Sequence, residues 1–456
     1  MSVPADILDP AAQAARDAAA RPGRHAASLH NTLVYGLCAL LSFGPLAFGA
    51  TEPWSVTVLE IGTSALVLVW MAKQVSLRRI KIRYNPLYLP MSLLALLVLF
   101  QLVSGMTAYR YITTTRATLF LAYAAIFFVV VQTLRSDRDL KLFSNWFSIF
   151  GFLVALFAIV QGLTDKTGKL YWVRLPRFGG WTYGPYVDHS HYAGLMEMLL
   201  PLPLVMAVLG VQRGNKRVLL WLFTGTMMAS IFLSQSRGGV LAMLIELAFL
   251  AAVAVPRSSA RRHHRTGFAA VAAAIVFLAF VAWLGGDALL ERFSVPRQQD
   301  LVGPGRPLIL KDSVRLIAHK PVTGWGLGTY PLVFPQVRSF YTSLFINHAH
   351  NDYAELVAET GIVGAVVIAW FLFALYRAGL SKVRNRQSRT IDAVTLYSLT
   401  SCTAIVAHSF WDFNLQIPAN AALFFALCGL ASARLTAPRV REQAAAETSA
   451  AGEADW

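Results

Sequence analysis

A dense run of polar and titratable residues, NHAHNDYAELVAETGIVG at 347–364, stands directly before a long apolar stretch. Its two histidines, His348 and His350, could bind a metal ion, relay protons or act as a general base. A metal ion shared with Asp352 is disfavoured, because residues two apart on a helix point to nearly opposite sides and the sequence offers no obvious further ligands. The sequence therefore predicts no metal here and leaves a catalytic base or a solvated helix cap.

The spacing after His350 predicts that this histidine begins a helix that continues into the apolar stretch. Small residues recur at steps of three or four, which places them on one helix face with the histidine: His350, Ala354, Ala358, Gly361 and Ala365. Such a stripe lets another helix or a lipid chain approach the backbone closely. The alternative that the stripe only packs against another helix, with a histidine at its solvent-exposed end, remains open as well.

A second candidate is Arg237, in the stretch SQSRGGVLA (234–242) between two apolar runs. An arginine at a membrane boundary is costly to force into hydrocarbon, so it calls for a partner. No carboxylate stands within several residues of it in sequence. A phosphate is a suitable partner, because a guanidinium offers it bidentate donors. The alternative is an arginine that extends to the lipid headgroups.

Further charged residues accompany these candidates. The longer connections on the same side as Arg237 are basic, which an anionic ligand presented from the membrane would explain and anionic lipid headgroups would explain equally well. These basic residues are Arg174, Arg177, Arg292, Arg297, Arg306, Lys311, Arg315, Lys320 and Arg338. Acids at or near apolar runs could relay protons or pair with arginines: Glu60, Glu197, Glu246, Glu355 and Glu359.

A membrane-spanning scaffold must position these residues. Of the 456 residues, 56% are hydrophobic and 14% charged, whereas a soluble protein carries about a quarter charged residues. Many apolar runs are long enough to cross roughly 30 Å of hydrocarbon. The sequence predicts an all-α polytopic protein with about twelve transmembrane helices. The expected spans are 33–50, 54–72, 87–107, 115–133, 142–163, 191–210, 217–234, 239–256, 267–285, 353–376, 392–411 and 418–433.

Every second connection between these spans is strongly basic. By the positive-inside rule these connections and both termini face the cytoplasm, which places 164–190 and 286–352 in the periplasm. Because the basic residues sit mostly in short connections, the net charge of +16 reflects insertion in a bilayer rather than binding of nucleic acid.

The expected organisation is a cytoplasmic disordered tail (1–30), nine transmembrane helices (31–285), a large periplasmic loop (286–352), three transmembrane helices (353–434) and a second disordered tail (435–456). Apolar residues at helical spacing from Leu308 to Ile317 predict a short helix inside the loop, lying on the membrane surface. No cleavable signal peptide is apparent. The three cysteines lie in apolar runs, so disulfides are not expected.

Several segments, in order, resemble motifs of the O-antigen ligase and polymerase superfamily, bacterial membrane enzymes of the GT-C type. The resemblance covers about 180–430. It is carried by GPYVDHSHYAGLMEMLLPL (184–202), SQSRGGVL with Arg237 and Leu241, GPGRPLILKDSVRLIAHKPVTGWGLGTYPLVFP (303–335) with Arg306, HNDYAELVAETGIVG with His350, Asn351, Gly361 and Gly364, and HSFWDFNLQIPANA (408–421). Asp188 and Ser190 stand where the family pattern leads us to expect asparagines.

The resemblance implies metal- and cofactor-independent, inverting transfer of a glycan from undecaprenyl diphosphate to an acceptor hydroxyl. It implies His350 as the base that takes the hydroxyl proton, and Arg237 with Arg306 as stabilisers of the departing diphosphate. The remaining expected substrate-binding residues are Asn351, Arg315, His191, His348 and Arg177.

The acceptor remains open within this resemblance. A lipid A core would make the protein a ligase, a second lipid-linked repeat a polymerase, and a protein hydroxyl a protein O-oligosaccharyltransferase. A flippase or transporter of lipid-linked saccharide is the alternative of a different class. It is disfavoured, because transporters place polar groups near the membrane midplane and here they stand at the outer ends of spans.

Overall fold

A computed structural model of the protein describes residues 23–165, 167–176, 180–254, 305–342, 345–385 and 387–434. Within these ranges the chain forms helices and loops, with two isolated β-bridges and no named strand. Nine helical segments of the described chain are long and apolar enough to cross a membrane, and Tyr88–Val103 and Pro418–Ser432 are shorter apolar helices. The prediction of an all-α polytopic membrane protein is therefore confirmed. The expected span 267–285 lies outside the described residues, so the count of twelve stays a prediction.

The helices follow one another with short connections. In chain order they are α2 (Arg24–Leu46), η1 (Phe48–Ala50), α3 (Pro53–Ser76), α4 (Tyr88–Val103), α5 (Arg110–Thr133), α6 (Asp137–Thr164), α7 (His189–Leu199), α8 (Pro201–Val208), α9 (Asn215–Leu233), α10 (Arg237–Ala254), α13 (Arg306–His319), α14 (Tyr330–Val333), η3 (Phe334–Gln336), α15 (Asp352–Arg384), α16 (Arg389–His408), η4 (Asn414–Gln416) and α17 (Pro418–Ser432). Because α2 begins at Arg24, the end of the expected N-terminal tail is helical.

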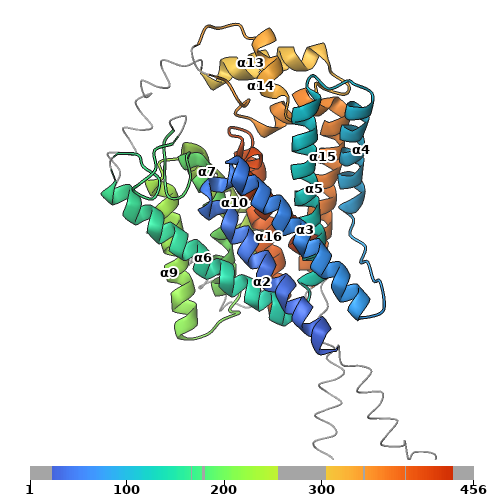
Figure 1. Ribbon diagram of the computed structural model, residues 1–456. Coiled ribbons are helices and arrows are strands. Elements are labelled where there is room, and N and C mark those ends of the chain that lie inside the picture. Colours follow the sequence, from blue (N-terminus) through green and yellow to red (C-terminus); the bar gives the residue numbers. More distant parts are fainter. Residues whose placement is uncertain are drawn as a thin grey trace, which may run out of the picture.

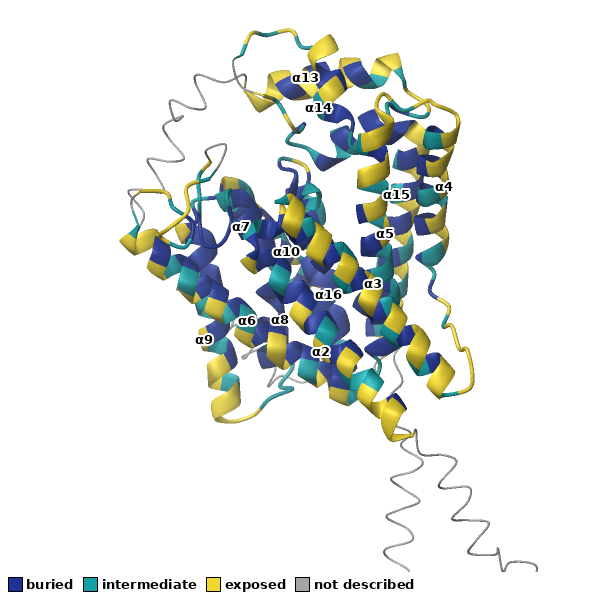
Figure 2. Ribbon diagram, viewed as in Figure 1, coloured by how far each residue is buried: buried dark blue, intermediate teal, exposed yellow. Residues whose placement is uncertain are grey.

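The helices α7, α8, α16 and α17 form the centre of the bundle. Together α7 and α8 form one apolar segment, His189–Val208. Of its most apolar 18-residue stretch 94% is buried, whereas the corresponding figure for α3 is 28%. Around this centre α10 packs on α16, α5 on α17 and α4 on α15. The outward faces of α3 and α4 carry exposed apolar side chains such as Leu68 and Leu96 (Figure 2). Exposed apolar surface of this extent suits contact with lipid.

One end of the bundle is covered by α13 and α14, which lie above α4, α5 and α15 (Figure 1). We call this end the α13 face. The sequence predicted a helix from Leu308 to Ile317, and α13 contains both residues. Buried residues of this segment, including Ile309, Leu316 and Tyr330, form a small core that also contains Ala358 of α15. The segment is therefore folded onto the bundle.

A break in α15 fixes this covering segment. Gly361 adopts φ 65° and ψ −168° inside the helix, a conformation that glycine tolerates best. The break frees backbone carbonyls, and those of Ala358 and Glu359 accept hydrogen bonds from the amides of Trp325 (3.0 Å) and Gly326 (2.9 Å). A side chain at Gly361 would overlap the carbonyl of Val322. The loop 321–326 therefore locks into the break.

This geometry corrects two expectations about the small-residue stripe. His350 does not begin the helix, because Asn351 is the N-cap and the helix starts at Asp352. The stripe is also not one continuous helix face, because Gly361 interrupts it. The close backbone approach that small residues permit does occur there, and its partner is the loop 321–326.

Candidate functional site

A buried carboxylate, Asp412, lies at the centre of the polar groups of the α13 face. It stands in the loop between α16 and α17, and its side chain is 4% exposed. Three imidazoles and one guanidinium approach it: His191 Nε2 at 3.8 Å, His350 Nδ1 at 3.9 Å, His408 Nε2 at 4.0 Å and Arg306 Nη2 at 3.8 Å. We call these five residues the Asp412 cluster. Its members come from α7, α13, α16 and the two loops before α15 and α17, so only the folded bundle assembles it.

The spacing inside the Asp412 cluster leaves room for another group. Distances of 3.8 to 4.0 Å exceed a direct hydrogen bond. The nitrogens of His191, His350 and His408 that face Asp412 have no hydrogen-bond partner among the described residues. Buried polar atoms are ordinarily paired, and catalytic hydrogen bonds often become short only when substrate binds. The cluster thus fits a site that a water or a substrate group completes.

Phe413 holds three histidine rings around the cluster. His348 stacks on its ring with centroids 4.3 Å apart, while His191 and His350 meet it edge to face at 4.5 and 5.0 Å. His348 also bonds Glu355 Oε1 through Nδ1 at 2.8 Å, and Glu355 Oε2 accepts from the amide of Ala349 at 2.9 Å. Glu355 therefore fixes the backbone that presents His350.

His350 itself is held in a strained conformation. Its φ is 50°, which is uncommon for any residue with a side chain, and its side chain is 31% exposed. Burial, with a smaller contribution from the charge of Arg306, outweighs the opposing effect of Asp412 and lowers the pKa of His350 to about 4. The imidazole is therefore neutral near pH 7. Such strain is often found where a side chain is aimed at a function.

Asp412 is kept ionised. Burial would raise the pKa of Asp412, but its contacts with His191 and the charges of Arg306 and His408 outweigh burial and hold that pKa well below its usual range. On the far side of the cluster, His408 Nδ1 bonds Glu197 Oε1 at 2.9 Å. That bond directs His408 Nε2 toward Asp412.

The two arginines of the resemblance lie beside the cluster. Arg306 donates from Nη1 to the carbonyl of Trp411 at 2.6 Å, and its side chain is 54% exposed, so part of the guanidinium faces solvent. Arg237 is exposed at the start of α10. Its neighbour Gly238 has no room for a side chain, because a Cβ would overlap Trp411 and His408. Arg237 therefore stands at the edge of the Asp412 cluster.

Two helix N-termini meet here. Asp188 caps α7 by accepting from the amide of Ser190 at 2.7 Å. Ser236 Oγ accepts from the amide of Gly239 at 3.1 Å at the start of α10, and donates to Ser190 Oγ at 3.1 Å. Helix N-termini carry partial positive charge, so this edge of the cluster favours an anion next to Arg237.

The other expected site residues have different surroundings. Asn351 is the N-cap of α15: its Oδ1 accepts from the amide of Ala354 at 2.9 Å and its Nδ2 donates to the carbonyl of Phe410 at 2.8 Å. Arg315 pairs with Asp312 at 3.0 Å. Among the described residues neither arrangement includes a member of the Asp412 cluster, so substrate binding by Asn351 or Arg315 stays a prediction. Arg177 lies outside the described residues.

The metal question changes in one respect. His348 bonds Glu355, and Asp352 Oδ2 accepts from Ser409 Oγ at 2.8 Å, so the trio considered in the sequence has separate partners. Instead, Asp188, His191 and Asp412 bring potential ligand atoms within 4.8 Å of one another. One oxygen of Asp188 is already engaged in the helix cap. This trio could hold a cation, and metal independence therefore calls for a direct test.

Sequence reasoning missed Asp412, His408 and Glu197 as a connected set. The available signal was the polar run HSFWDFN before the last span and the acid in the last turn of α7. Their connection depends on contacts between residues far apart in the chain, such as Glu197 with His408.

The fold and the site together define a polytopic α-helical membrane protein with a histidine, carboxylate and arginine centre at one end of its bundle. Residues 218–369 match a protein-family model described as O-Antigen ligase. The match covers less than half of the chain, contains Arg237, Arg306 and His350, and confirms the resemblance to the O-antigen ligase and polymerase superfamily of membrane enzymes. No curated protein matches the chain.

Proposed function

We propose that this protein is a glycosyltransferase that moves a glycan from undecaprenyl diphosphate to an acceptor hydroxyl at the periplasmic side of the bacterial inner membrane. The α13 face is then the periplasmic face. The observation that carries the proposal is the meeting of the neutral His350, the ionised Asp412 and Arg306 in one partly open cluster. The family match over 218–369 supports the reaction class.

His350 acts as the general base. The acceptor hydroxyl loses its proton as its oxygen attacks the anomeric carbon, and a neutral imidazole can take that proton. Nδ1 of His350 faces Asp412, so a proton on Nδ1 leaves Nε2 free to receive the proton of the acceptor. Asp412 thereby selects the tautomer and stabilises the imidazolium once it forms.

Arg306 and Arg237 act on the leaving group. As the bond between the anomeric carbon and the diphosphate oxygen breaks, negative charge grows on the undecaprenyl diphosphate that departs. Guanidinium groups and the N-terminus of α10 can stabilise that charge. Because the acceptor attacks from the side opposite the diphosphate, the configuration at the anomeric carbon inverts. No metal is needed for this scheme.

A deletion strain tests the function and separates its forms. Lipopolysaccharide gels and an exopolysaccharide assay are run on cells that lack the protein. Full-length glycans left on undecaprenyl diphosphate indicate a ligase, and single repeats indicate a polymerase. If neither the lipopolysaccharide nor the exopolysaccharide changes, the protein is neither a ligase nor a polymerase of these glycans, and transfer to a protein hydroxyl remains.

Transport of lipid-linked saccharide is the competing function. A transporter needs a membrane that separates two compartments, whereas an enzyme does not. Glycan transfer by the purified protein in detergent therefore supports the enzyme. If the purified protein fails to transfer glycan in detergent but translocates lipid-linked saccharide in proteoliposomes, the protein is a transporter and the enzyme proposal is wrong.

A further inference from the structure

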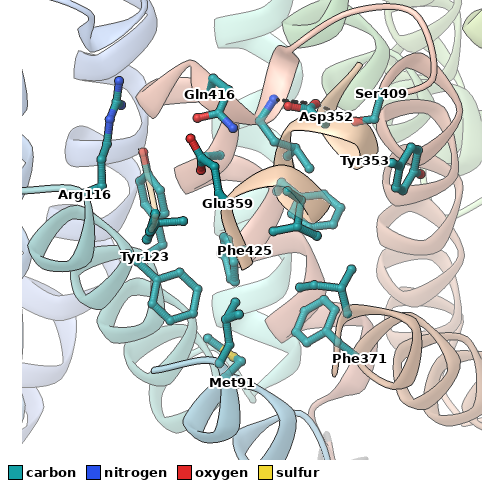
Figure 3. A pocket seen from close by; sticks show the side chains of 18 of the residues that line it. Met91, Arg116, Tyr123, Asp352, Tyr353, Glu359, Phe371, Ser409, Gln416 and Phe425 are labelled. Carbon is teal, nitrogen blue, oxygen red and sulfur yellow. Dashed lines mark hydrogen bonds between the residues drawn. The ribbon is translucent and has the colours of Figure 1, made fainter. Parts of the chain in front are cut away.

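A cavity lies on the other side of the loop that carries Asp412. It measures about 180 Å³ and opens between α4, α5, α15, α16 and α17. Its walls are apolar, with Met91, Tyr123, Phe371 and Phe425 among the side chains that surround it (Figure 3). An apolar cavity of about 150 Å³ is large enough to admit benzene. This one can therefore take part of a hydrocarbon chain.

Polar groups gather at one end of this cavity. Figure 3 shows Arg116, Glu359, Gln416 and Asp352 at the same end, above the rings of Phe371 and Phe425. Arg116 interacts electrostatically with Glu359 at this end of the cavity, but within the described chain no hydrogen bond or ion pair occupies its guanidinium, whose donors can therefore also meet an anionic group. Asp352 is buried, and its Oδ1 likewise lacks a partner in the described chain. The cavity thus joins an apolar interior to an end that suits a charged, hydroxyl-bearing head.

The loop 409–416 separates this cavity from the Asp412 cluster. Ser409, Leu415 and Gln416 line the cavity, whereas Trp411 and Asp412 contact Arg306. The segment at the start of α15 likewise contributes to both sites. His350 faces Asp412, and Asp352, two residues later, bonds Ser409 and lines the cavity. The backbone that presents His350 to Asp412 therefore runs directly into the wall of the cavity at Asp352.

We propose that this cavity binds the hydrocarbon chain of a lipid-anchored acceptor whose anionic head lies at Arg116. The inference rests on the proposed function. In an inverting displacement the attacking hydroxyl and the leaving diphosphate lie on opposite sides of the anomeric carbon. With the diphosphate at Arg237 and Arg306, the acceptor approaches from the side of the cavity. An acceptor anchored in the bilayer would place its hydrocarbon chain in the cavity between α4, α15 and α17 and its glycan at His350.

Photocrosslinking tests the occupant without turnover. Leu372, which lines the cavity, is replaced by p-benzoylphenylalanine, and the exposed neighbour Phe373 on the same helix is replaced likewise as the matched control. Both proteins are irradiated in native membranes, and the captured lipid is identified by mass spectrometry. We expect position 372 to capture a glycan-bearing acidic lipid and position 373 to capture bulk phospholipid. The mass distinguishes a lipid A acceptor from a polyprenyl-linked one.

The same experiment distinguishes acceptor from donor. In a variant that also carries R237A and R306A, the diphosphate stabilisers are gone, and capture at position 372 should persist. Loss of capture there would assign the cavity to the donor chain and overturn the inference. Capture of the same phospholipid mixture at both positions would overturn it too, by showing a cavity that is merely open to the bilayer.

Steady-state kinetics with an active preparation gives the second measurement. L372W fills the cavity and F373W adds the same side chain outside it. We expect L372W to raise KM for the lipid-anchored acceptor roughly tenfold or more, because several methylene groups lose their burial. KM for the donor should stay unchanged, as should use of the same acceptor glycan freed of its lipid. Equal KM values in L372W and F373W would remove the cavity from acceptor binding while leaving the proposed transfer intact.

Discussion

At the scale of single residues, the site depends on a histidine that stays neutral and a carboxylate that stays charged. Loss of the His350 imidazole removes the proposed base. In a reconstituted transfer assay we expect H350A to lose about 10²- to 10⁴-fold in turnover, the usual contribution of a positioned base. H319A is the matched control, because His319 is an exposed histidine on α13 whose side chain bonds, within the described chain, the carbonyl of Arg315 alone. Turnover of H350A equal to that of H319A would remove the assignment.

The pH profile follows from the lowered pKa of His350. Because that pKa lies at about 4, the neutral base is present above pH 4 and is lost as the pH falls through that value. We expect kcat/KM to change little between pH 7 and pH 5, whereas a histidine with the ordinary pKa of about 6.5 would lose about twenty-fivefold over that interval. In R306Q the acid limb should move to higher pH, because the cation that lowers the pKa of His350 is gone. If the acid limb of the kcat/KM profile of the unmodified protein has its midpoint near pH 6.5, the pKa of His350 is not lowered as proposed.

Metal independence is tested through the trio Asp188, His191 and Asp412. We expect prolonged dialysis against EDTA to leave the rate of transfer unchanged, since guanidinium groups and helix N-termini supply the charge that would otherwise come from a cation. A rate that falls with EDTA, recovers with a divalent ion and loses that recovery in H191A would establish the trio as a metal site.

The sequence, through the family resemblance it carries, singled out several residues that the fold brings together here, but not the residue at their centre. Arg306, His191 and His350 were each expected near the substrate, and all three meet Asp412. Asp412 itself has no distinguishing local spacing, and its importance comes only from groups on four other segments. The partners of Asn351 and Arg315 were equally invisible, because a helix cap and a local ion pair have the same residue types as a binding site.

At the scale of elements, hydropathy predicted the spans well because apolar length is a local property of the chain. The break in α15 was missed, because the small-residue spacing continues through Gly361 without a local sign of interruption. The break is held by loop 321–326, whose backbone amides donate hydrogen bonds to carbonyls of α15. That pairing joins two segments across a long stretch of chain, and no periodicity in either segment encodes it.

The joint at Gly361 makes a stability prediction. An alanine with positive φ costs about 1–2 kcal/mol by itself, and at Gly361 its side chain would also overlap Val322 and Thr323. Gly105 also has positive φ, but a Cβ there would have no neighbour within 4 Å. We therefore expect G361A to lower the melting temperature in detergent clearly more than G105A does. Equal shifts would show that the contact with loop 321–326 contributes nothing to stability.

At the scale of the whole molecule, the arrangement of the helices decides which compartment the site faces. The Asp412 cluster and α13 lie at one end of the bundle, and the basic connection between α3 and α4 lies at the other (Figure 1). Basic connections favour the cytoplasm, so the α13 face should be periplasmic. Donor and acceptor would then both reach His350 from the outer leaflet of the inner membrane.

Cysteine labelling tests this orientation. Tyr341, 93% exposed beyond α14, and Ile80, 80% exposed in the basic connection, suit single substitutions. The three native cysteines are buried, so they should give little background with a membrane-impermeant maleimide. We expect Tyr341→Cys to react in intact spheroplasts and Ile80→Cys only after the membrane is permeabilised. The reverse pattern would place His350 and its arginines in the cytoplasm, where a periplasmic transfer reaction could not use them.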